Sequence, residues 1–194
     1  LGGVGSGTTI ENIEIVANDD DGIEWFGGTV NVKNVVVWNV GDDAIDTDQS
    51  WGGTLDNFIV INPGDECLEL DGPEGTMVAK HIIKNGTVYA GNAQGLVDLD
   101  DANIPSDSYV DIDSVYFFGL KVGQDFDSVP TYYPCTFSNL EATLPAGTTL
   151  EQFFKDGSSA FTTAVNAGEN TVGADASVFA GWSWTAVSGS LNGF

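Results

Sequence analysis

The sequence contains no arginine and has few positive charges of any kind. Its 194 residues include five lysines and one histidine against 29 acidic residues, so the formal net charge is −24 at pH 7. Nucleic acids and anionic membrane surfaces would repel such a chain, and we therefore expect neither as a partner. Cation binding, or adaptation to salty water, agrees better with this charge.

Long apolar runs are also missing, and cysteine is rare. No run approaches the roughly 18 apolar residues of a membrane-spanning helix, so membrane insertion is not expected. Cys67 and Cys135 allow one disulfide, and two unpaired thiols are an equally good interpretation. The chain starts with Leu-Gly-Gly rather than methionine, and residues 1–9 are in register with the end of a repeat. We therefore expect the C-terminal part of a longer protein, with any targeting segment outside this sequence.

Glycine and β-branched residues are frequent, and residues 20–71 repeat one pattern. Acidic pairs at 20–21, 42–43 and 65–66 follow each other at steps of 22 and 23 residues. After each pair comes a short strand with apolar residues at alternate positions, then a glycine-rich corner and a longer β-branched strand. A unit of this length cannot bury its own apolar face, so successive copies must stack. The repeat predicts an all-β, right-handed parallel β-helix, which is a solenoid of stacked coils.

An asparagine marks the longer strand of each coil. Asn12, Asn34, Asn57 and Asn85 occupy this place, and Asp113 continues the series. Stacked coils would bring these side chains about 4.8 Å apart, where amide groups can form a hydrogen-bonded asparagine ladder. Alternatively, asparagine is used there because it tolerates left-handed backbone geometry. The recurrence in register favours the ladder.

The repeat fades in the last third of the chain. We assign residues 1–123 to the coils and residues 124–194 to a final coil, loops and a C-terminal cap of the same domain. Residues 135–144 are typical of a last pair of strands, and residues 149–156 of a short helix. Because the open end of a solenoid would template further strands, we interpret the aromatic residues of this region as its cover, with an aromatic sugar-binding platform as the alternative. The residues concerned are Phe161, Phe179, Trp182 and Trp184.

Carboxylates fill the outward positions of the short strands. One register contains Glu24, Asp46, Glu69 and Asp98, and a second, two residues further on, contains Asp48, Asp71 and Asp100. Strand alternation puts both columns on one outer face, with like charges about 5 Å apart. Such stacking destabilises a sheet, and Ca²⁺, which takes about six to eight oxygen ligands, would relieve it. The pattern therefore predicts a Ca²⁺ site on this face or in the Asp-rich turns beside it. A solvated acidic face adapted to salt is the alternative.

Residues 19–46, DDDGIEWFGGTVNVKNVVVWNVGDDAID, resemble the strand-turn pattern of right-handed parallel β-helix proteins of the pectin-lyase-like superfamily. They are similar in particular to polygalacturonases, in which an Asp-Gly-Ile turn is followed about one coil later by an Asp-Asp pair. This resemblance implies that Asp21, Asp42 and Asp43 are the acid and the water-activating carboxylates of an inverting glycosidase. That chemistry needs two carboxyl groups far enough apart to hold a water molecule between them.

The sequence also departs from the polygalacturonase pattern. That family adds a Gly-His-Gly turn one coil further on and an Arg-x-Lys soon after, whereas here residues 64–66 are Gly-Asp-Glu and no arginine is available to bind a uronate. We interpret the only histidine, His81, as solvent-exposed or packed against a loop rather than catalytic. In a lyase, Lys80 or Lys84 could replace the usual arginine base only in principle. The acidic face would repel a polyuronate unless calcium bridged the two.

Residues 41–46 and 171–186 also resemble secreted β-helix proteins of marine and Bacteroidota-type bacteria, which implies a secreted or surface-attached solenoid and no particular activity. The sequence thus favours a non-catalytic module, extracellular or on the cell surface, that binds Ca²⁺ and has a glycan ligand or a structural role. The alternative is a polysaccharide-degrading enzyme, either a polygalacturonase-like hydrolase or a lyase. The expected partners are a polysaccharide or other copies of the chain stacked end to end.

Overall fold

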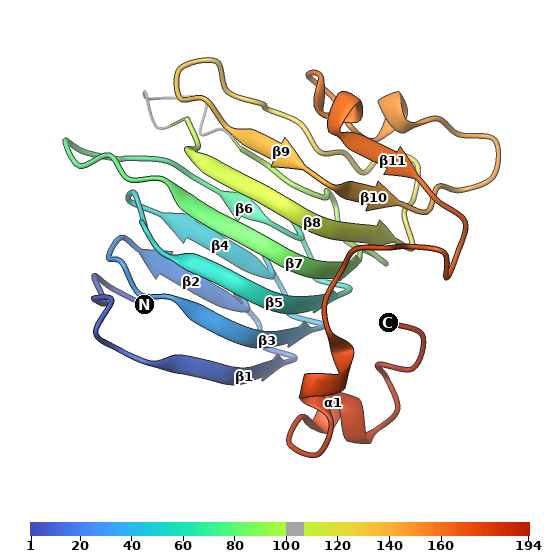
Figure 1. Cartoon of the computed structure of the whole chain (residues 1–194), viewed down its shortest axis with the longest axis horizontal. Helices are drawn as coiled ribbons and strands as arrows, with labels where there is room; N and C mark the ends of the chain where they lie inside the picture. Colours follow the sequence, from blue (N-terminus) through green and yellow to red (C-terminus); the bar gives the residue numbers. More distant parts are fainter. Residues whose placement is uncertain (100–106) are drawn as a thin grey trace.

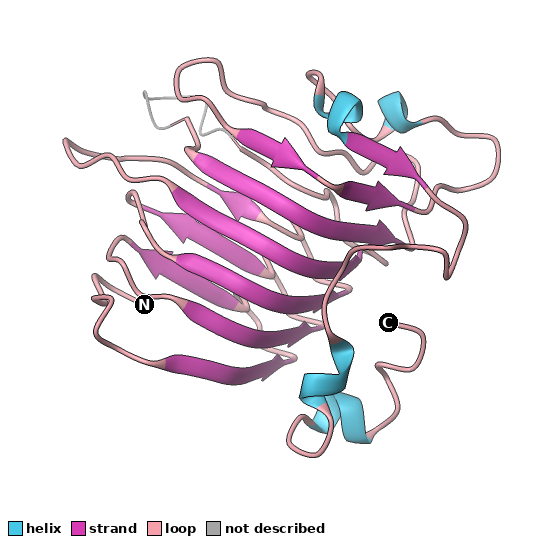
Figure 2. Cartoon of the chain, viewed as in Figure 1, coloured by secondary structure: helices cyan, strands magenta, loops and turns pink. Residues whose placement is uncertain are grey.

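The computed structural model describes residues 1–99 and 107–194, which form a solenoid of parallel strands (Figure 1, Figure 2). A large sheet has the strand order β1-β3-β5-β7-β8-β10-β11, with β9 also beside β8, and a small sheet has the order β2-β4-β6. All of these strand pairs are parallel. The predicted all-β parallel β-helix is therefore confirmed.

The large sheet consists of β1 (Ile10–Val16), β3 (Val32–Trp38), β5 (Thr54–Ile61), β7 (His81–Tyr89), β8 (Val110–Phe118), β9 (Thr136–Ser138), β10 (Leu140–Ala142) and β11 (Thr162–Ala164). The small sheet consists of β2 (Ile23–Phe26), β4 (Ile45–Asp48) and β6 (Glu69–Leu70). The helices are short: the 3-10 helices η1 (Leu150–Gln152), η2 (Ser158–Phe161) and η3 (Ala176–Phe179), and α1 (Trp184–Val187). None of the helices in the described part of the chain has the length and apolar character that crossing a membrane would require.

The coils stack in the register that the acidic pairs predict. Ile23 of β2 lies beside Ile45 of β4, and Val35 of β3 lies beside Phe58 of β5. These inward-facing residues are buried and fill the space between the two sheets. Gly86 shows how closely the coils approach, because a Cβ atom there would lie 2.1 Å from Cζ of Phe58. One-coil repetition thus produces one continuous core.

The asparagine ladder forms across the first three coils. Nδ2 of Asn34 donates to Oδ1 of Asn12, and Nδ2 of Asn57 donates to Oδ1 of Asn34, both at 2.9 Å. All three residues also have left-handed backbones, with φ of 61°, 58° and 64° for Asn12, Asn34 and Asn57. The two explanations for asparagine are therefore both correct and act together. A second ladder bond, from Nδ2 of Asn62 to Oδ1 of Asn39 at 2.8 Å, was not predicted.

The prediction that Asp113 continues the ladder was wrong. Lys84 pairs with Asp113 in the β7–β8 register, so the residue beside Asn85 is Ser114, whose φ is 58°. The position requires a left-handed backbone, and serine adopts it here while Asp113 stays in the strand. Asn85 also departs from the predicted ladder, because its Nδ2 donates to Oδ1 of Asp56, at 2.7 Å, rather than to Asn57.

The predicted last pair of strands at 135–144 is present as β9 and β10, which follow each other in the same direction. Both β9 and β10 run parallel to β8, and Asn139 lies between them with φ of 53°. Asn139 therefore bends one strand in the manner of the ladder asparagines rather than reversing the chain. The short helix predicted at 149–156 exists as η1, where the N–H of Thr149 donates to Oε1 of Gln152 at 2.8 Å.

The C-terminal aromatic residues do not form one cover over the open end. Residues 170–194, which we name the strap, run back along the large sheet from β11 to the first coils (Figure 1). Phe179 of the strap is buried in a cluster with Val36 and Ile59, which lie on the outer side of the large sheet. The reason is visible in the sequence: consecutive apolar residues at 35–37 and 58–61 leave apolar groups on both sides of the strands, so the outer side also needs a cover.

Glu14 of β1 anchors the distal end of the strap. Its carboxylate accepts hydrogen bonds from Oγ of Ser183 at 2.5 Å and from the N–H groups of Trp184 and Thr185, both at 2.8 Å. Although burial opposes the charged form, these hydrogen bonds lower the pKa of Glu14. The indole of Trp184 stacks on Trp38 with a centroid distance of 5.3 Å. The strap thereby connects the last coils to the first.

Candidate functional site

The small sheet carries a column of carboxylates. Glu24 pairs with Asp46, Asp46 with Glu69, and Glu69 with Asp98 in successive coils. Their neighbours along the strands, such as Trp25 and Leu70, are fully buried and point into the core. The carboxylates therefore face outward from the small sheet, and we name this surface, with the turns that lead into it, the acidic face.

Two members of the second predicted column, Asp48 and Asp71, lie in the part of the chain that the structure describes. Asp48 pairs with Phe26 of the preceding coil, and the N–H of Asp71 donates to the carbonyl of Thr47 at 2.8 Å. Asp48 and Asp71 are both partly exposed. Asp100, which the sequence adds to this column, lies outside the described residues.

A third column, formed by the acidic turns, completes the acidic face. The N–H of Asp43 donates to Oδ1 of Asp21 at 3.3 Å, and the N–H of Glu66 donates to Oδ1 of Asp43 at 2.7 Å. The next coil places Gly95 beside Glu66, where a Cβ atom would lie 2.1 Å from Oε2 of Glu66. The sequence predicted these turns as one register but did not assign Glu66 to the site. Glu66 could have been assigned from the repeat, because it lies one coil after Asp43.

Crowding perturbs the acid–base properties of the acidic face. Asp46 is only 7% exposed. Burial, together with the charges of Glu69 and other nearby carboxylates, raises the pKa of Asp46 to about 9. The same two causes raise the pKa of Glu69 to about 9 and that of Glu66 to about 8. For Asp43, burial raises the pKa to about 6, against hydrogen bonds that lower it. At neutral pH this surface therefore holds protons that ordinary carboxylates would release.

Among the described residues, three groups of carboxylates are close enough to share a metal ion. In each group, one oxygen from every residue lies within 4.8 Å of the others. The groups are Asp21, Glu24 and Asp46; Asp20, Asp21 and Asp42; and Asp42, Asp43 and Asp65. Two oxygens bound to one Ca²⁺ at about 2.3–2.6 Å are at most about 5 Å apart, so all three groups fit this ion. They lie at the end of the acidic face where the turns enter the strands.

The three carboxylates implied by the resemblance to polygalacturonases lie together in these turns. Oxygens of Asp21 and Asp42 approach within 4.8 Å, as do those of Asp42 and Asp43. Inverting glycosidases separate their two carboxyl groups by about 6.5–9.5 Å. Asp21 and Asp43 also accept main-chain hydrogen bonds from the next coil, which gives them a structural role. The Asp21–Asp42 and Asp42–Asp43 pairs are therefore closer together than the two carboxyl groups of an inverting site.

Of the two environments predicted for His81, solvent exposure is wrong, whereas packing against a loop is correct, because its ring contacts Trp51 in the loop between β4 and β5. His81 is 1% exposed, with Nε2 3.2 Å from Oγ1 of Thr47 and its ring 5.6 Å from that of Trp51. Burial lowers the pKa of His81 to about 3, so the imidazole is neutral. His81 is the first residue of β7 and faces inward. The alternation of inward and outward residues along the strand could have predicted this orientation. His81 therefore belongs to the core and does not contact the acidic face.

Of the lysines proposed as possible bases, Lys84 lies in β7 of the large sheet and Lys80 directly precedes that strand. Lys80 forms an ion pair with Asp111 and lies over the ring of Tyr109 at 5.2 Å. Nζ of Lys84 is 3.9 Å from Oδ2 of Asp56 in the large sheet. Neither lysine is placed to act on a substrate bound at the acidic face. The two cysteines are free thiols, which decides between the two interpretations of Cys67 and Cys135.

The family model described as "Pectate-lyase like beta helix domain" matches residues 1–185. The chain belongs to this family. The assignment agrees with the parallel coils, and it supports a polysaccharide-related or structural module. Searches of the curated proteins and of the solved structures found no match.

Proposed function

We propose that this pectate-lyase-like β-helix domain is a non-catalytic module, extracellular or on the cell surface, that binds Ca²⁺ on its acidic face. The observation that carries the proposal is the group formed by Asp21, Glu24 and Asp46. Their oxygens lie within 4.8 Å of one another although Asp46 is almost fully buried. Carboxylates so close together repel each other, and a divalent cation replaces the repulsion by coordination.

The affinity that such a site would have supports the proposed extracellular location. Ca²⁺ sites of extracellular modules have dissociation constants of about 10⁻⁴–10⁻³ M, in the range of extracellular calcium. We expect a weak affinity of this order at the acidic face. The raised pKa of Asp46 means that Ca²⁺ must displace a proton from it on binding, which lowers the affinity. The adjacent groups in the turns would supply further oxygens to the same ion or to a second one.

Calorimetry and thermal unfolding at pH 7.5 test the calcium site. We expect heat on titration with CaCl₂ and a rise in Tm at millimolar Ca²⁺, both greatly reduced in Asp46→Asn and in Glu24→Gln. Glu74→Gln, which alters an exposed acidic residue in the 72–80 loop, is the matched control and should keep both signals. Absence of heat together with an unchanged Tm in the unaltered protein would reject the site.

One observation favours a second function, glycoside hydrolysis. The pKa of Asp43, raised to about 6 mainly by burial, is suitable for a general acid near neutral pH, and Asp42 lies beside it. Release of reducing ends from neutral and acidic polysaccharides, with Asp42→Asn as the control, tests this function. Turnover that disappears in Asp42→Asn would establish an enzyme and overturn the non-catalytic assignment.

A further inference from the structure

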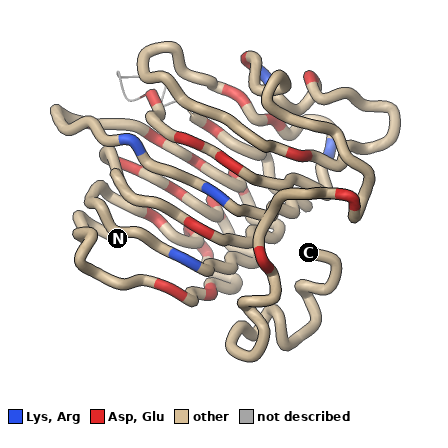
Figure 3. The backbone as a smooth tube through the Cα atoms, in the orientation of Figure 1, with Lys and Arg blue, Asp and Glu red and all other residues tan. Residues whose placement is uncertain are grey.

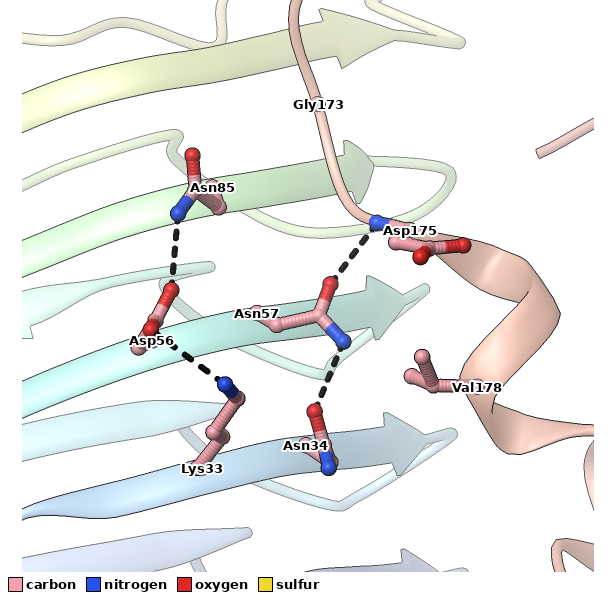
Figure 4. Close-up of a pocket in the computed structure, with 8 residues that line it drawn as sticks. All are labelled: Lys33, Asn34, Asp56, Asn57, Asn85, Gly173, Asp175 and Val178. Carbon is pink, nitrogen blue, oxygen red and sulfur yellow. Dashed lines mark hydrogen bonds and ion pairs between the residues drawn. The ribbon is translucent and has the colours of Figure 1, made fainter.

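The outer side of the large sheet contains a polar groove on the opposite side of the core from the acidic face. Two hollows of about 320 and 410 Å³ adjoin there and share Lys33 and Asp56 in their floors. The strap closes one end, with Gly173, Asp175 and Val178 in the wall of the first hollow (Figure 4). Residues of the first coil, among them Ser6 and Thr8, line the other end. The two hollows follow each other along the strand direction, and each of them spans several neighbouring strands of the sheet.

Charges alternate along the floor of this groove. In the strand registers Glu11 lies beside Lys33, Lys33 beside Asp56, Asp56 beside Lys84, and Lys84 beside Asp113. Figure 3 shows the corresponding alternation of red and blue segments across the large sheet. The local charge therefore nearly cancels, although the chain as a whole has a net charge of −24. A strongly charged ligand of either sign gains little here.

The floor retains hydrogen-bonding capacity for a ligand. Nζ of Lys33 and Nζ of Lys84 are each 3.9 Å from Oδ2 of Asp56, which is too long for a hydrogen bond. Each ammonium group has three N–H donors, and the two lysine side chains are 57% and 39% exposed. Donors and an acceptor thus stand side by side at the spacing of neighbouring strands, about 4.8 Å.

The amides of Asn57 and Asn85 and the carboxylate of Asp56 are held in place before any ligand binds. Asn57 donates to Asn34 and accepts from the N–H of Asp175 at 2.7 Å, while Asn85 fixes Oδ1 of Asp56 (Figure 4). Val178, which is 38% exposed, adds an apolar contact from the strap. Preorganised polar groups lose little entropy on binding.

We propose that this groove binds a neutral glycan, with the sugar chain lying across the strands. Each hydroxyl of a sugar both donates and accepts a hydrogen bond, so vicinal hydroxyls match an ammonium group beside a carboxylate. The two hollows have the volume of small-ligand sites, and the strap supplies the apolar contact that the C–H face of a sugar ring requires. A polyuronate is disfavoured because Glu11, Asp56 and Asp175 contribute carboxylates to the groove. This site does not depend on calcium binding at the acidic face.

Affinity electrophoresis tests the groove. Native gels would contain galactomannan, laminarin or dextran as neutral glycans, or polygalacturonate as the acidic one, with each variant's mobility normalised to a gel without polysaccharide. We expect at least one neutral glycan to retard the unaltered protein. Its apparent dissociation constant should rise tenfold or more in Lys33→Met and in Asp56→Asn. Lys121→Met is the matched control, since this lysine bonds to Asn92 away from the groove.

Two further variants keep the outcome decisive. Val178→Glu narrows the groove from the exposed strap without touching the strands, and it should also weaken retardation tenfold. Glu69→Gln alters only the acidic face and should leave retardation unchanged. The proposal is overturned if no neutral glycan retards the protein, if polygalacturonate retards it more strongly, or if Glu69→Gln rather than the groove variants abolishes retardation. The last two outcomes would leave calcium binding at the acidic face untouched.

Discussion

The two sheets of this solenoid arrange charge in opposite ways. On the large sheet the column that contains Lys33, Asp56 and Lys84 alternates in sign from coil to coil. On the small sheet the column that contains Asp46 and Glu69 repeats one sign. The side chains of both columns lie on parallel strands with the same spacing, so the stacking geometry does not explain why the sign alternates in one column and repeats in the other.

The difference shows that the acidic face is not merely a consequence of an acidic composition. Like charges stacked in neighbouring strands destabilise a sheet, and opposite charges stabilise it. The chain has only five lysines, yet it places Lys33 and Lys84 where each separates two carboxylates on the large sheet. None is placed in the columns of the small sheet. This asymmetry is expected if cations bound from solution, rather than lysine side chains, neutralise the carboxylates of the small sheet.

The largest difference between the two outer sides concerns their aromatic residues. Phe179 of the strap is fully buried against the large sheet, whereas Phe26 on the small sheet is 39% exposed. Phe179→Ala should lower the free energy of unfolding by about 3–4 kcal/mol because it leaves a cavity, and Phe26→Ala by less than about 1 kcal/mol. Urea unfolding with equal slopes would measure both. Equal effects of the two substitutions would contradict the strap as a structural cover.

The pH dependence of stability should reveal the like charges of the small sheet. Because the pKa values of Asp46, Glu69 and Glu66 are raised in the folded state, the folded protein holds more protons than the unfolded chain between about pH 4 and pH 9. Their stabilising contribution is complete below the ordinary carboxyl pKa and is lost as pH rises. In chelator we expect stability to fall by about 3 kcal/mol from pH 5 to pH 8, after allowing for solvent screening of these partly exposed groups.

Two controls isolate the acidic face in this experiment. Glu69→Gln removes one titrating group and should reduce the loss between pH 5 and pH 8 by about 1 kcal/mol. Glu14 and Glu141, whose hydrogen bonds outweigh burial and lower their pKa values, contribute to stability that is lost only at more acidic pH. A stability that is constant or that increases from pH 5 to pH 8 would show that the carboxylates of the small sheet ionise normally.

Much of the fold could be predicted because a solenoid converts repetition along the chain into proximity in space. The acidic pairs at 20–21, 42–43 and 65–66 fix the coil length, and the coil length fixes which residues pair. The prediction failed where the coil length does not identify the exact residue. It placed Asp113 at the ladder position, whereas the left-handed backbone there belongs to Ser114. It also failed for the strap, because its contacts with the first coils are more than 100 residues distant in sequence, as in the bond from Asp175 to Asn57.

The register of the acidic face was predicted for the same reason, but of the predicted Ca²⁺ ligands that the structure describes, only Glu24 and Asp46 belong to the groups whose oxygens lie within 4.8 Å of one another. The register of Glu24, Asp46 and Glu69 follows from the repeat step, and the structure places these residues as expected. The depth of Asp46 could not be predicted, because it depends on how the turns carrying Asp21 and Asp43 fold over the strands. The groove was missed entirely. It requires both the floor of the large sheet and the strap that closes one end, and the strap was assigned to the wrong surface.

Reversing the charge of Lys84 has the smallest expected effect, and it tests directly whether charge order distinguishes the two sheets. Lys84→Glu would place a third carboxylate between Asp56 and Asp113 and give the part of this column from β5 to β8 a single sign. We expect a loss of about 1 kcal/mol, roughly half of it in Lys84→Gln, because the lysine is partly exposed. Urea unfolding at low salt would show this loss, and 1 M NaCl should remove most of it by screening. At pH 8 Glu69→Gln on the small sheet should instead increase stability, since the raised pKa of Glu69 makes folding take up a proton that glutamine does not need. If the two substitutions change stability in the same direction, charge order does not distinguish the two sheets.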